Sequence, residues 1–541
     1  MINLDCDVLV IGAGAAGSAL CWRLSHYSSL KVICVEQGDF TKTNNYPTNY
    51  IDWELRKEVD FSTNPKARYM LGEFIVDDSN SPIKTSYYSG VGGSTVLFSG
   101  HFPRLHPSDF KVKTLDGIAD DWPISYELLE PYYELNDKNI GVAGLSGDPA
   151  YPEISGLLPP IPLGTMGEVV ANAMNRLGWH WWPSYSAINT IDSEFGSKCI
   201  NLGPCNSGCA QGAKSSSDQR YWPKSLQKGV RLITNTRVMK LVTNQSDLVE
   251  GAICRNRNGE TMTISSKIYV VAGNGVWTPH LLLNSACDRF PQGLANRSGL
   301  LGRNLMIHPL AYVEGVYPDD IESSTGPQGC CILSQEFYET DLSRGYFRGF
   351  TMQVLRSPGP LETMKRNLTR KKASFGSSFH DDFIRTFNRT IGISMISEDL
   401  PEFQNSVSLS PTNDSFGSRI PSVHYSVGEN TKKILSHSVT VGSQILSKIG
   451  AADIIKFAPV SNSGWHLLGT ARMGLSANDS VTNAQGQTHD VPNLFIADGS
   501  LFVTSGSVNP ASTIQALAIY IADQIIAKFS KLSESRLTSP L

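Results

Sequence analysis

Near its start the chain reads Cys6-Asp-Val-Leu-Val-Ile-Gly-Ala-Gly-Ala-Ala-Gly17, an apolar run that leads into three spaced glycines. The apolar part predicts a buried strand, and Gly12 permits the tight turn that must follow it. Gly14 has no Cβ, so a pyrophosphate can approach the main chain, and Gly17 lets the next helix pack closely. The free N–H groups and the dipole at the start of that helix favour anions. The segment therefore predicts a cradle for a dinucleotide.

A carboxylate completes this unit. The second apolar run, Lys31-Val-Ile-Cys-Val-Glu36, predicts another strand and ends in an acid. At this place in the unit a carboxylate accepts hydrogen bonds from the adenosine ribose hydroxyls. The same charge would repel a 2′-phosphate, so Glu36 argues against NADP. The motif alone does not distinguish FAD from NAD.

Length and composition exclude several classes of protein. At 541 residues the chain exceeds one ordinary core, so two or more domains are expected. A net charge of −4 gives no electrostatic reason to bind nucleic acid. No run approaches about 18 uninterrupted apolar residues, so no membrane span is predicted. The first predicted strand begins almost at the N-terminus, which leaves no room for a signal peptide and predicts a cytoplasmic protein.

Elements of a nucleotide-binding fold recur in the middle and near the end of the chain. Ile268-Tyr-Val-Val-Ala-Gly-Asn-Gly275 predicts a strand that ends in glycines, and Asn493-Leu-Phe-Ile-Ala-Asp-Gly499 predicts a further buried strand. A long apolar helix follows, with Pro510 at its first position, where a missing N–H has no cost. We therefore predict an α/β fold with a discontinuous, Rossmann-like FAD- or NAD-binding domain formed by residues 1–310 and 456–541.

The intervening residues 311–455 have a different pattern. They lack glycine fingerprints and contain alternating segments such as Ser406-Val-Ser-Leu-Ser410 and Ser422-Val-His-Tyr-Ser426. Alternation of this kind is typical of an antiparallel sheet with one covered face. We expect residues 311–455 to form the substrate-binding domain.

Several blocks, in order along nearly the whole chain, resemble the glucose-methanol-choline (GMC) oxidoreductases. After the N-terminal cradle they are Ser89-Gly-Val-Gly-Gly-Ser-Thr95, Gly302-Arg-Asn-Leu-Met-Ile-His-Pro309, Trp465-His-Leu-Leu-Gly-Thr-Ala-Arg-Met-Gly474 and Val508-Asn-Pro510. The resemblance implies a GMC or p-hydroxybenzoate-hydroxylase-like architecture, FAD as the cofactor and an alcohol as the substrate. The segments 104–114, 121–126 and 285–298 resemble the branch that contains the catalytic subunits of bacterial FAD-dependent glucose, gluconate and related sugar dehydrogenases.

Oxidation of an alcohol by a flavin needs a base, because a proton must leave the oxygen while a hydride leaves the carbon. Histidine suits this role near neutral pH. The resemblance implies that His466 is the base, that Asn509 hydrogen-bonds the same oxygen, and that the hydride goes to flavin N5. Local sequence alone also fits a core histidine and a helix N-cap. His101, His106 and His308 lack such a match and are expected to be structural.

The resemblance also implies how the cofactor is held. It assigns FAD contacts to Asp498, to the backbone of Val238 near the adenine, and to the segment that contains Gly92, Gly93 and Ser94. Several family members attach FAD covalently through a histidine in this segment, but residues 92–98 contain neither histidine nor cysteine. We therefore expect non-covalent FAD.

Three of the ten cysteines, Cys199, Cys205 and Cys209, are grouped on a glycine-bearing loop. Closely spaced thiolates can hold an iron–sulfur cluster, although four ligands are usual. Their spacing resembles the motif with which FAD-dependent sugar dehydrogenase subunits bind a 3Fe-4S cluster. The alternative is a loop with free thiols or a local disulfide.

We thus predict FAD-dependent oxidation of an alcohol group on a sugar or polyol-like substrate, with a dehydrogenase favoured over an oxidase. A cluster would pass electrons to a cytochrome c or a quinone-linked subunit, and the chain would reach the periplasm only with a signal-bearing partner. The alternatives are an oxidase that forms hydrogen peroxide and a non-redox flavin-dependent lyase of the same fold.

Overall fold

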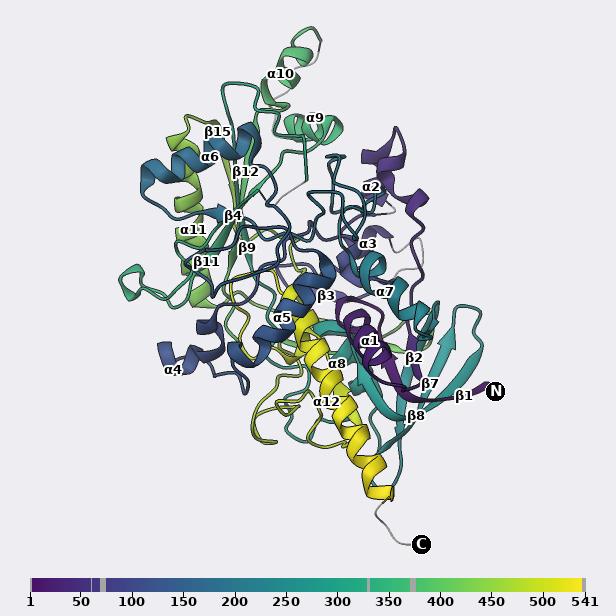
Figure 1. The fold of residues 1–541 in the computed structure, drawn as a ribbon. Helices are drawn as coiled ribbons and strands as arrows, with labels where there is room; N and C mark the ends of the chain where they lie inside the picture. The colour runs from purple at the N-terminus through teal and green to yellow at the C-terminus, as the bar shows by residue number, and fades with distance from the viewer. Residues whose placement is uncertain (1, 60, 69–73, 328–330, 370–375, 538–541) are drawn as a thin grey trace.

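The computed structural model describes residues 2–59, 61–68, 74–327, 331–369 and 376–537. Two large sheets lie at opposite ends of an elongated molecule, and the long helix α12 (Ala511–Leu537) runs beside the first of them (Figure 1). None of the helices within the described ranges is both long and apolar enough to cross a membrane.

The first sheet is assembled from distant parts of the chain. Its strand order is β5-β2-β1-β8-β7-β6, with β16 also paired to β8. The strands are β1 (Ile2–Ile11), β2 (Val32–Val35), β5 (Arg231–Ile233), β6 (Thr236–Thr243), β7 (Val249–Asn256), β8 (Thr261–Val271) and β16 (Leu494–Ile496). The strands β5, β2, β1, β8 and β16 pair in parallel, while β6 and β7 form an antiparallel extension. The predicted α/β, Rossmann-like unit is confirmed.

Apolar runs explain why β1, β2 and β8 are central strands. Parallel strands are covered on both faces and read as continuous apolar sequence. Helix α1 (Ala15–Tyr27) makes the crossover from β1 to β2, and α12 packs against α1 (Figure 1). Helix α12 is apolar on all sides over residues 516–522, which are buried, as expected for a central helix.

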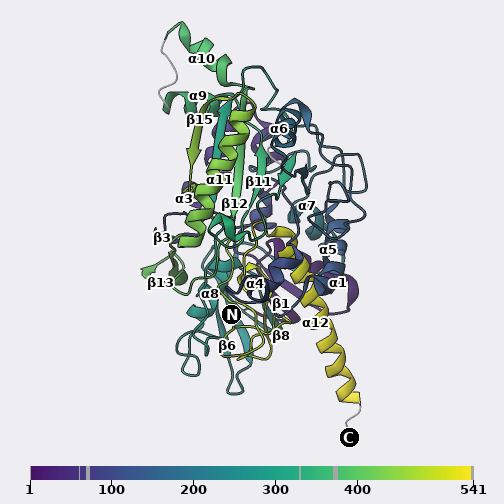
Figure 2. The ribbon, with the colours of Figure 1, turned by 90° about the vertical axis from the view of Figure 1, so that its left-hand side faces the viewer.

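The second sheet has the order β15-β9-β12-β11-β10-β4. Its strands are β4 (Trp182–Pro183), β9 (Leu310–Val316), β10 (Ile332–Ser334), β11 (Phe350–Leu355), β12 (Thr390–Ser397) and β15 (Ala452–Phe457). All its pairings are antiparallel. Helix α11 (Glu429–Lys448) lies across one face of the sheet (Figure 2), and α6 (Gly164–Leu177) joins the same apolar cluster.

The alternating segments in the middle of the chain pair differently from our expectation. The strands β13 (Ser406–Asn413) and β14 (Arg419–His424) are antiparallel, as predicted, but they form a separate small sheet with β3 (Asp77–Asn80). This sheet packs on α8 (Asn274–Asn284), because the apolar sides of the strands are buried against Val276 and Trp277. The second sheet, in turn, takes β4 from outside residues 311–455. The domain boundaries therefore stay a prediction.

The remaining helices surround these sheets. They are α2 (Trp53–Val59), α3 (Pro65–Arg68), α4 (Val112–Asp116), α5 (Tyr126–Ile140), α7 (Ser217–Gln227), α9 (Pro360–Thr369) and α10 (Ser378–Thr386).

Candidate active site

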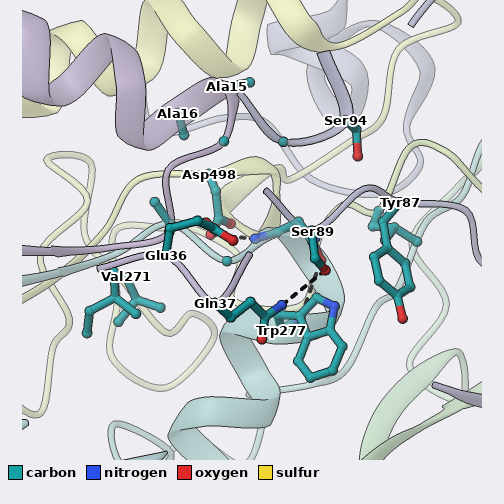
Figure 3. Close-up of a pocket in the computed structure, with 18 of the residues that line it drawn as sticks. Ala15, Ala16, Glu36, Gln37, Tyr87, Ser89, Ser94, Val271, Trp277 and Asp498 are labelled. Carbon is teal, nitrogen blue, oxygen red and sulfur yellow. Dashed lines mark hydrogen bonds between the residues drawn. The ribbon is translucent and has the colours of Figure 1, made fainter. Parts of the chain in front are cut away.

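A cavity opens where β1, β2 and β8 end, with about 1150 Å³ of empty space. Figure 3 shows it between Ala15 and Ala16 of α1 on one side and Trp277 of α8 on the other. The carboxyl ends of parallel strands are the usual place for a ligand in such sheets. The predicted cofactor positions that line it are Gly12, Gly14, Glu36, Gly93, Ser94, Val238 and Asp498.

The glycine turn is shaped by contacts that leave no space for side chains. Gly12 has φ +106°, and a Cβ there would lie 2.4 Å from the carbonyl oxygen of Ala272. A Cβ on Gly17 would lie 1.9 Å from the carbonyl oxygen of Gly12. Gly17 therefore stands behind the cavity and brings α1 close to β1.

The start of α1 offers free donors to an anion. Its N-cap residue is Gly14, no side chain caps the helix, and no acid occupies the first turn. The turn at residues 92–94 lies directly against this site, since the Gly92 N–H donates to the Ala13 carbonyl at 2.9 Å. A Cβ on Gly93 would lie 2.7 Å from the Gly14 Cα. These residues fit the pyrophosphate of a dinucleotide such as FAD.

Glu36 is held at the end of β2 by backbone amides. Its carboxylate accepts hydrogen bonds from Ala13 N at 2.8 Å and from Gly38 N at 2.9 Å. A carboxylate oxygen has further lone pairs, so Glu36 can also accept a ribose hydroxyl. The side chain thus tightens the glycine turn while it lines the cavity.

Asp498 lies two residues after β16 and connects the start of α8 with the short 3₁₀ helix Gly499–Leu501. One carboxylate oxygen accepts Asn274 N at 3.0 Å and the Thr278 hydroxyl at 2.5 Å, and the other accepts Ser500 N at 2.8 Å. Burial raises the pKa of Asp498, and these hydrogen bonds oppose the shift. Asp498 therefore fixes α8 relative to the segment that leads to α12. Contacts of Asp498 and Val238 with FAD stay predictions.

A second cavity, with about 1240 Å³ of empty space, adjoins the first. Residues that line both are Ala15, Ser94, Trp465, His466, Pro510 and Ile514. His466 therefore stands at the junction, and Asn509 lines the second cavity beside it. The structure thus brings together the two residues that the sequence nominated for chemistry.

His308 contacts His466, which our sequence analysis missed. The two Nδ1 atoms are 2.8 Å apart, and the rings meet edge to face. His308 has φ +58° although proline follows it, a strained conformation of the kind that clusters at functional sites. Asp399 supports it by accepting Ile307 N at 2.7 Å. The sequence signal that could have identified His308 is its position within the family-like block Gly302–Pro309.

Burial keeps three neighbouring histidines neutral. It lowers the pKa of His308 to about 4 and that of His101, which also lines the second cavity, to about 3. Burial, with smaller contributions from His308 and His101, lowers the pKa of His466 well below its usual range. A neutral His466 can accept a proton.

Asn509 is oriented from the second sheet. Its side-chain oxygen accepts a hydrogen bond from Gln353 Nε2 of β11 at 2.5 Å. The Ile514 N–H donates to the Pro510 carbonyl, so α12 begins at Ala511, two residues after Asn509. The amide of Asn509 is therefore fixed by a partner far away in sequence.

The cysteine loop is not arranged as a metal site. Cys199 Sγ accepts Asn201 N at 3.4 Å, and Cys205 Sγ contacts the Gly203 carbonyl at 3.5 Å. None of Cys199, Cys205 and Cys209 forms a disulfide with another cysteine that the structure describes. In the part of the chain that the structure describes, no three His, Cys, Asp or Glu side chains are grouped to hold a metal ion. Spacing alone did not determine where the sulfurs point.

Known proteins with similar sequences belong to the family that the sequence motifs resemble. Residues 164–310 and 401–518 match the N- and C-terminal domains of the GMC oxidoreductases. The 2-methyl-1,2-propanediol dehydrogenase of Mycolicibacterium austroafricanum is 38% identical over 98% of this chain and 97% of its own length. The fructose dehydrogenase large subunit of Gluconobacter japonicus is 27% identical over 97% of this chain and 98% of its own.

Solved structures share the fold. Pyridoxine 4-oxidase from Mesorbium loti superposes with a TM-score of 0.64 at 18% identity, covering 96% of this chain and 99% of its own. Formate oxidase from Aspergillus oryzae superposes with a TM-score of 0.62 at 14% identity, covering 98% of this chain and 100% of its own. The resemblance found in the sequence is confirmed: the chain belongs to the GMC oxidoreductases and is an FAD-dependent enzyme that oxidises alcohol groups.

Proposed function

We propose that this enzyme oxidises an alcohol group of a small polyol-like molecule, with His466 as the base and Asn509 as the group that orients the reacting oxygen. The observation that carries the proposal is that both residues line the second cavity, with His466 at its junction with the first. Relatives named for a diol and for fructose support a polyol-like substrate. Anaerobic mixing with candidate alcohols tests it, since a substrate must bleach the flavin absorbance.

FAD, when bound, supplies the acceptor for the hydride that leaves the alcohol carbon. We propose that the start of α1 and the Gly93-Ser94 turn hold its phosphates, that Glu36 holds the ribose, and that the Val238 backbone meets the adenine. The lining of the first cavity supports these assignments. The positive end of α12 would face the flavin, where negative charge develops on reduction.

His308 has a definite part in this proposal. When two Nδ1 atoms share one hydrogen bond, one of them carries the hydrogen and the other accepts it. For His466 to accept a proton at Nε2, its Nδ1–H must donate to His308. His308 would then select the tautomer of His466 that works as a base. Asn509 would use its NH₂ group toward the substrate oxygen, because its own oxygen is engaged by Gln353.

The pH profile should report the lowered pKa of His466. Because its pKa lies below the usual 6.5, the neutral base persists as the pH falls through 6. We expect kcat/KM to stay near its maximum at pH 6 and to fall only at lower pH. Initial rates of flavin reduction between pH 4.5 and 9 measure this. An acid limb with its midpoint at or above 6.5 would contradict it.

We expect the FAD to be non-covalent, because the 92–98 segment offers no attachment residue. Acid precipitation should release the yellow flavin into the supernatant, where its spectrum identifies it. Flavin that stays with the pellet after washing would show a covalent bond.

The route of the electrons after the flavin is a separate proposal. The cysteine spacing, which resembles the motif of cluster-binding sugar dehydrogenase subunits, supports a 3Fe-4S cluster, but iron would have to draw the three thiols together. Such a cluster would pass electrons to a one-electron acceptor. The relative named as a fructose dehydrogenase large subunit supports a companion subunit, with which the chain would be exported. Anaerobic preparations should then contain iron that Cys205→Ser removes while the flavin remains. Full flavin without iron, with oxygen consumed as fast as the alcohol is oxidised, would instead support the oxidase.

A further inference from the structure

The second sheet forms one wall of the second cavity. Side chains of a strand alternate between its two faces. On β11, Met352 and Val354 enter the apolar core under α11, whereas Gln353 and Leu355 line the cavity. On β12, Ile393 and Met395 enter the core, and the alternate residues Ser394 and Ile396 line the cavity. The cavity wall is therefore set by the pleat of two neighbouring strands.

Two polar residues stand together on this wall. Gln353 and Ser394 are directly opposite each other in the β11–β12 register, and each is only 3% exposed. Directly opposite side chains are close enough to bind one group jointly. The sheet residues around them that line the cavity are apolar, namely Leu310, Leu355 and Ile396. The polar pair is thus isolated on an apolar surface.

The side-chain nitrogen of Gln353 donates a hydrogen bond within the protein, whereas its side-chain oxygen can still accept one. Gln353 Nε2 donates to Asn509. Among the residues that the structure describes, none donates to Gln353 Oε1, and the Ser394 hydroxyl has no hydrogen-bond partner. Polar groups that are buried beside an apolar wall are costly unless a ligand or water satisfies them. Both groups therefore indicate a hydroxyl-bearing ligand.

We propose that Gln353 and Ser394 bind a second hydroxyl of the substrate, so that the enzyme selects a diol whose remaining substituents are apolar. This inference rests on the proposed function, in which Asn509 and His466 hold the reacting hydroxyl. Gln353, Ser394 and Asn509 line the same cavity, so a hydroxyl bound at Gln353 Oε1 and the hydroxyl bound at Asn509 can belong to one substrate molecule. The apolar remainder would lie along Leu355 and Ile396.

The kinetic test compares 1,2-propanediol with 1-propanol in the holoenzyme, by the rate of anaerobic flavin reduction. The wild type should prefer the diol. Ser394→Ala and Gln353→Leu should each lower the diol-to-alcohol ratio of kcat/KM by about 5- to 100-fold, the range for an unpaired buried polar group. Gln353→Leu should also slow both substrates, because Asn509 loses its partner. Ser397→Ala removes a buried hydroxyl from the same strand outside the cavity and should leave the ratio unchanged.

A binding test separates recognition from chemistry. Pinacol is a vicinal diol without a hydrogen on either hydroxyl-bearing carbon, so it can bind but cannot be oxidised. Its perturbation of the flavin spectrum should give a lower Kd than 2,3-dimethyl-2-butanol in the wild type, and Ser394→Ala should remove that difference.

Two failures are distinguishable. A diol-to-alcohol ratio that both variants leave unchanged would overturn the role of Gln353 and Ser394 while the alcohol oxidation stands. A wild-type flavin that neither alcohol reduces would overturn the proposed function itself. If Gln353→Leu slows both substrates equally and Ser394→Ala changes nothing, Gln353 acts only by orienting Asn509, and the inference is wrong.

Discussion

Replacement of His466 by alanine should slow the reduction of the flavin by substrate about 10²- to 10⁴-fold, the usual contribution of a positioned base. The flavin should stay bound, because the contacts that shape the glycine turn and Glu36 are made by other residues. Stopped-flow measurement of flavin bleaching under saturating alcohol gives the rate of this step directly. Asn509→Ala should have a smaller effect, since it orients the oxygen but takes no proton.

The control for this prediction is His424→Ala, which removes an exposed histidine at the end of β14. In this variant the substrate should reduce the flavin at the wild-type rate. His466→Gln provides a second variant, because glutamine is close to histidine in size and avoids the destabilising cavity that alanine would leave. Near wild-type flavin reduction in both His466 variants would remove this residue from the mechanism.

Replacement of Gly93 by alanine should weaken FAD binding by about 100-fold, the upper range for one overpacked methyl group. Gly93 has φ +54°, and the new Cβ would lie 2.7 Å from the Gly14 Cα. The two backbone segments cannot easily move apart, because the Gly92 N–H donates a hydrogen bond to the Ala13 carbonyl. The purified variant should be nearly colourless, and titration of the apoprotein with FAD should give the Kd.

A matched control distinguishes steric overlap from backbone strain. Gly117 also has positive φ, +72°, but a Cβ there would have no atom within 4 Å. Gly117→Ala should therefore lose only about 1 kcal/mol of stability from its backbone conformation and keep its FAD. Full flavin occupancy in Gly93→Ala would mean that the turn at residues 92–94 does not contact the cofactor site.

Some features followed from the sequence because their causes are local. The turn from β1 to α1 depends on Gly12 and Gly17, whose requirements arise within a few residues. The apolar runs predicted β1, β2 and β16 because buried parallel strands are apolar on both faces. The resemblance to a family, carried by ordered blocks, gave the cofactor and the chemistry, and it predicts His466 and Asn509 as the catalytic pair.

Other predictions failed or stayed incomplete where contacts between distant parts of the chain determine the structure. Alternation predicted that β13 and β14 pair, but only burial against Trp277 placed them on α8. The spacing of Cys199, Cys205 and Cys209 did not bring their sulfurs together as a ligand set, because side-chain direction depends on the path of the whole loop.

The sequence by itself determined the dinucleotide cradle, the class of fold and the two residues nominated for catalysis. Only the tertiary structure decided that His308 contacts His466 across 158 residues and that Gln353 contacts Asn509 across 156. It alone also decided that Ser394 faces the same cavity. The physical reason is that a local pattern specifies which face of a strand or helix is buried, whereas the neighbour of a polar side chain depends on how separate elements pack.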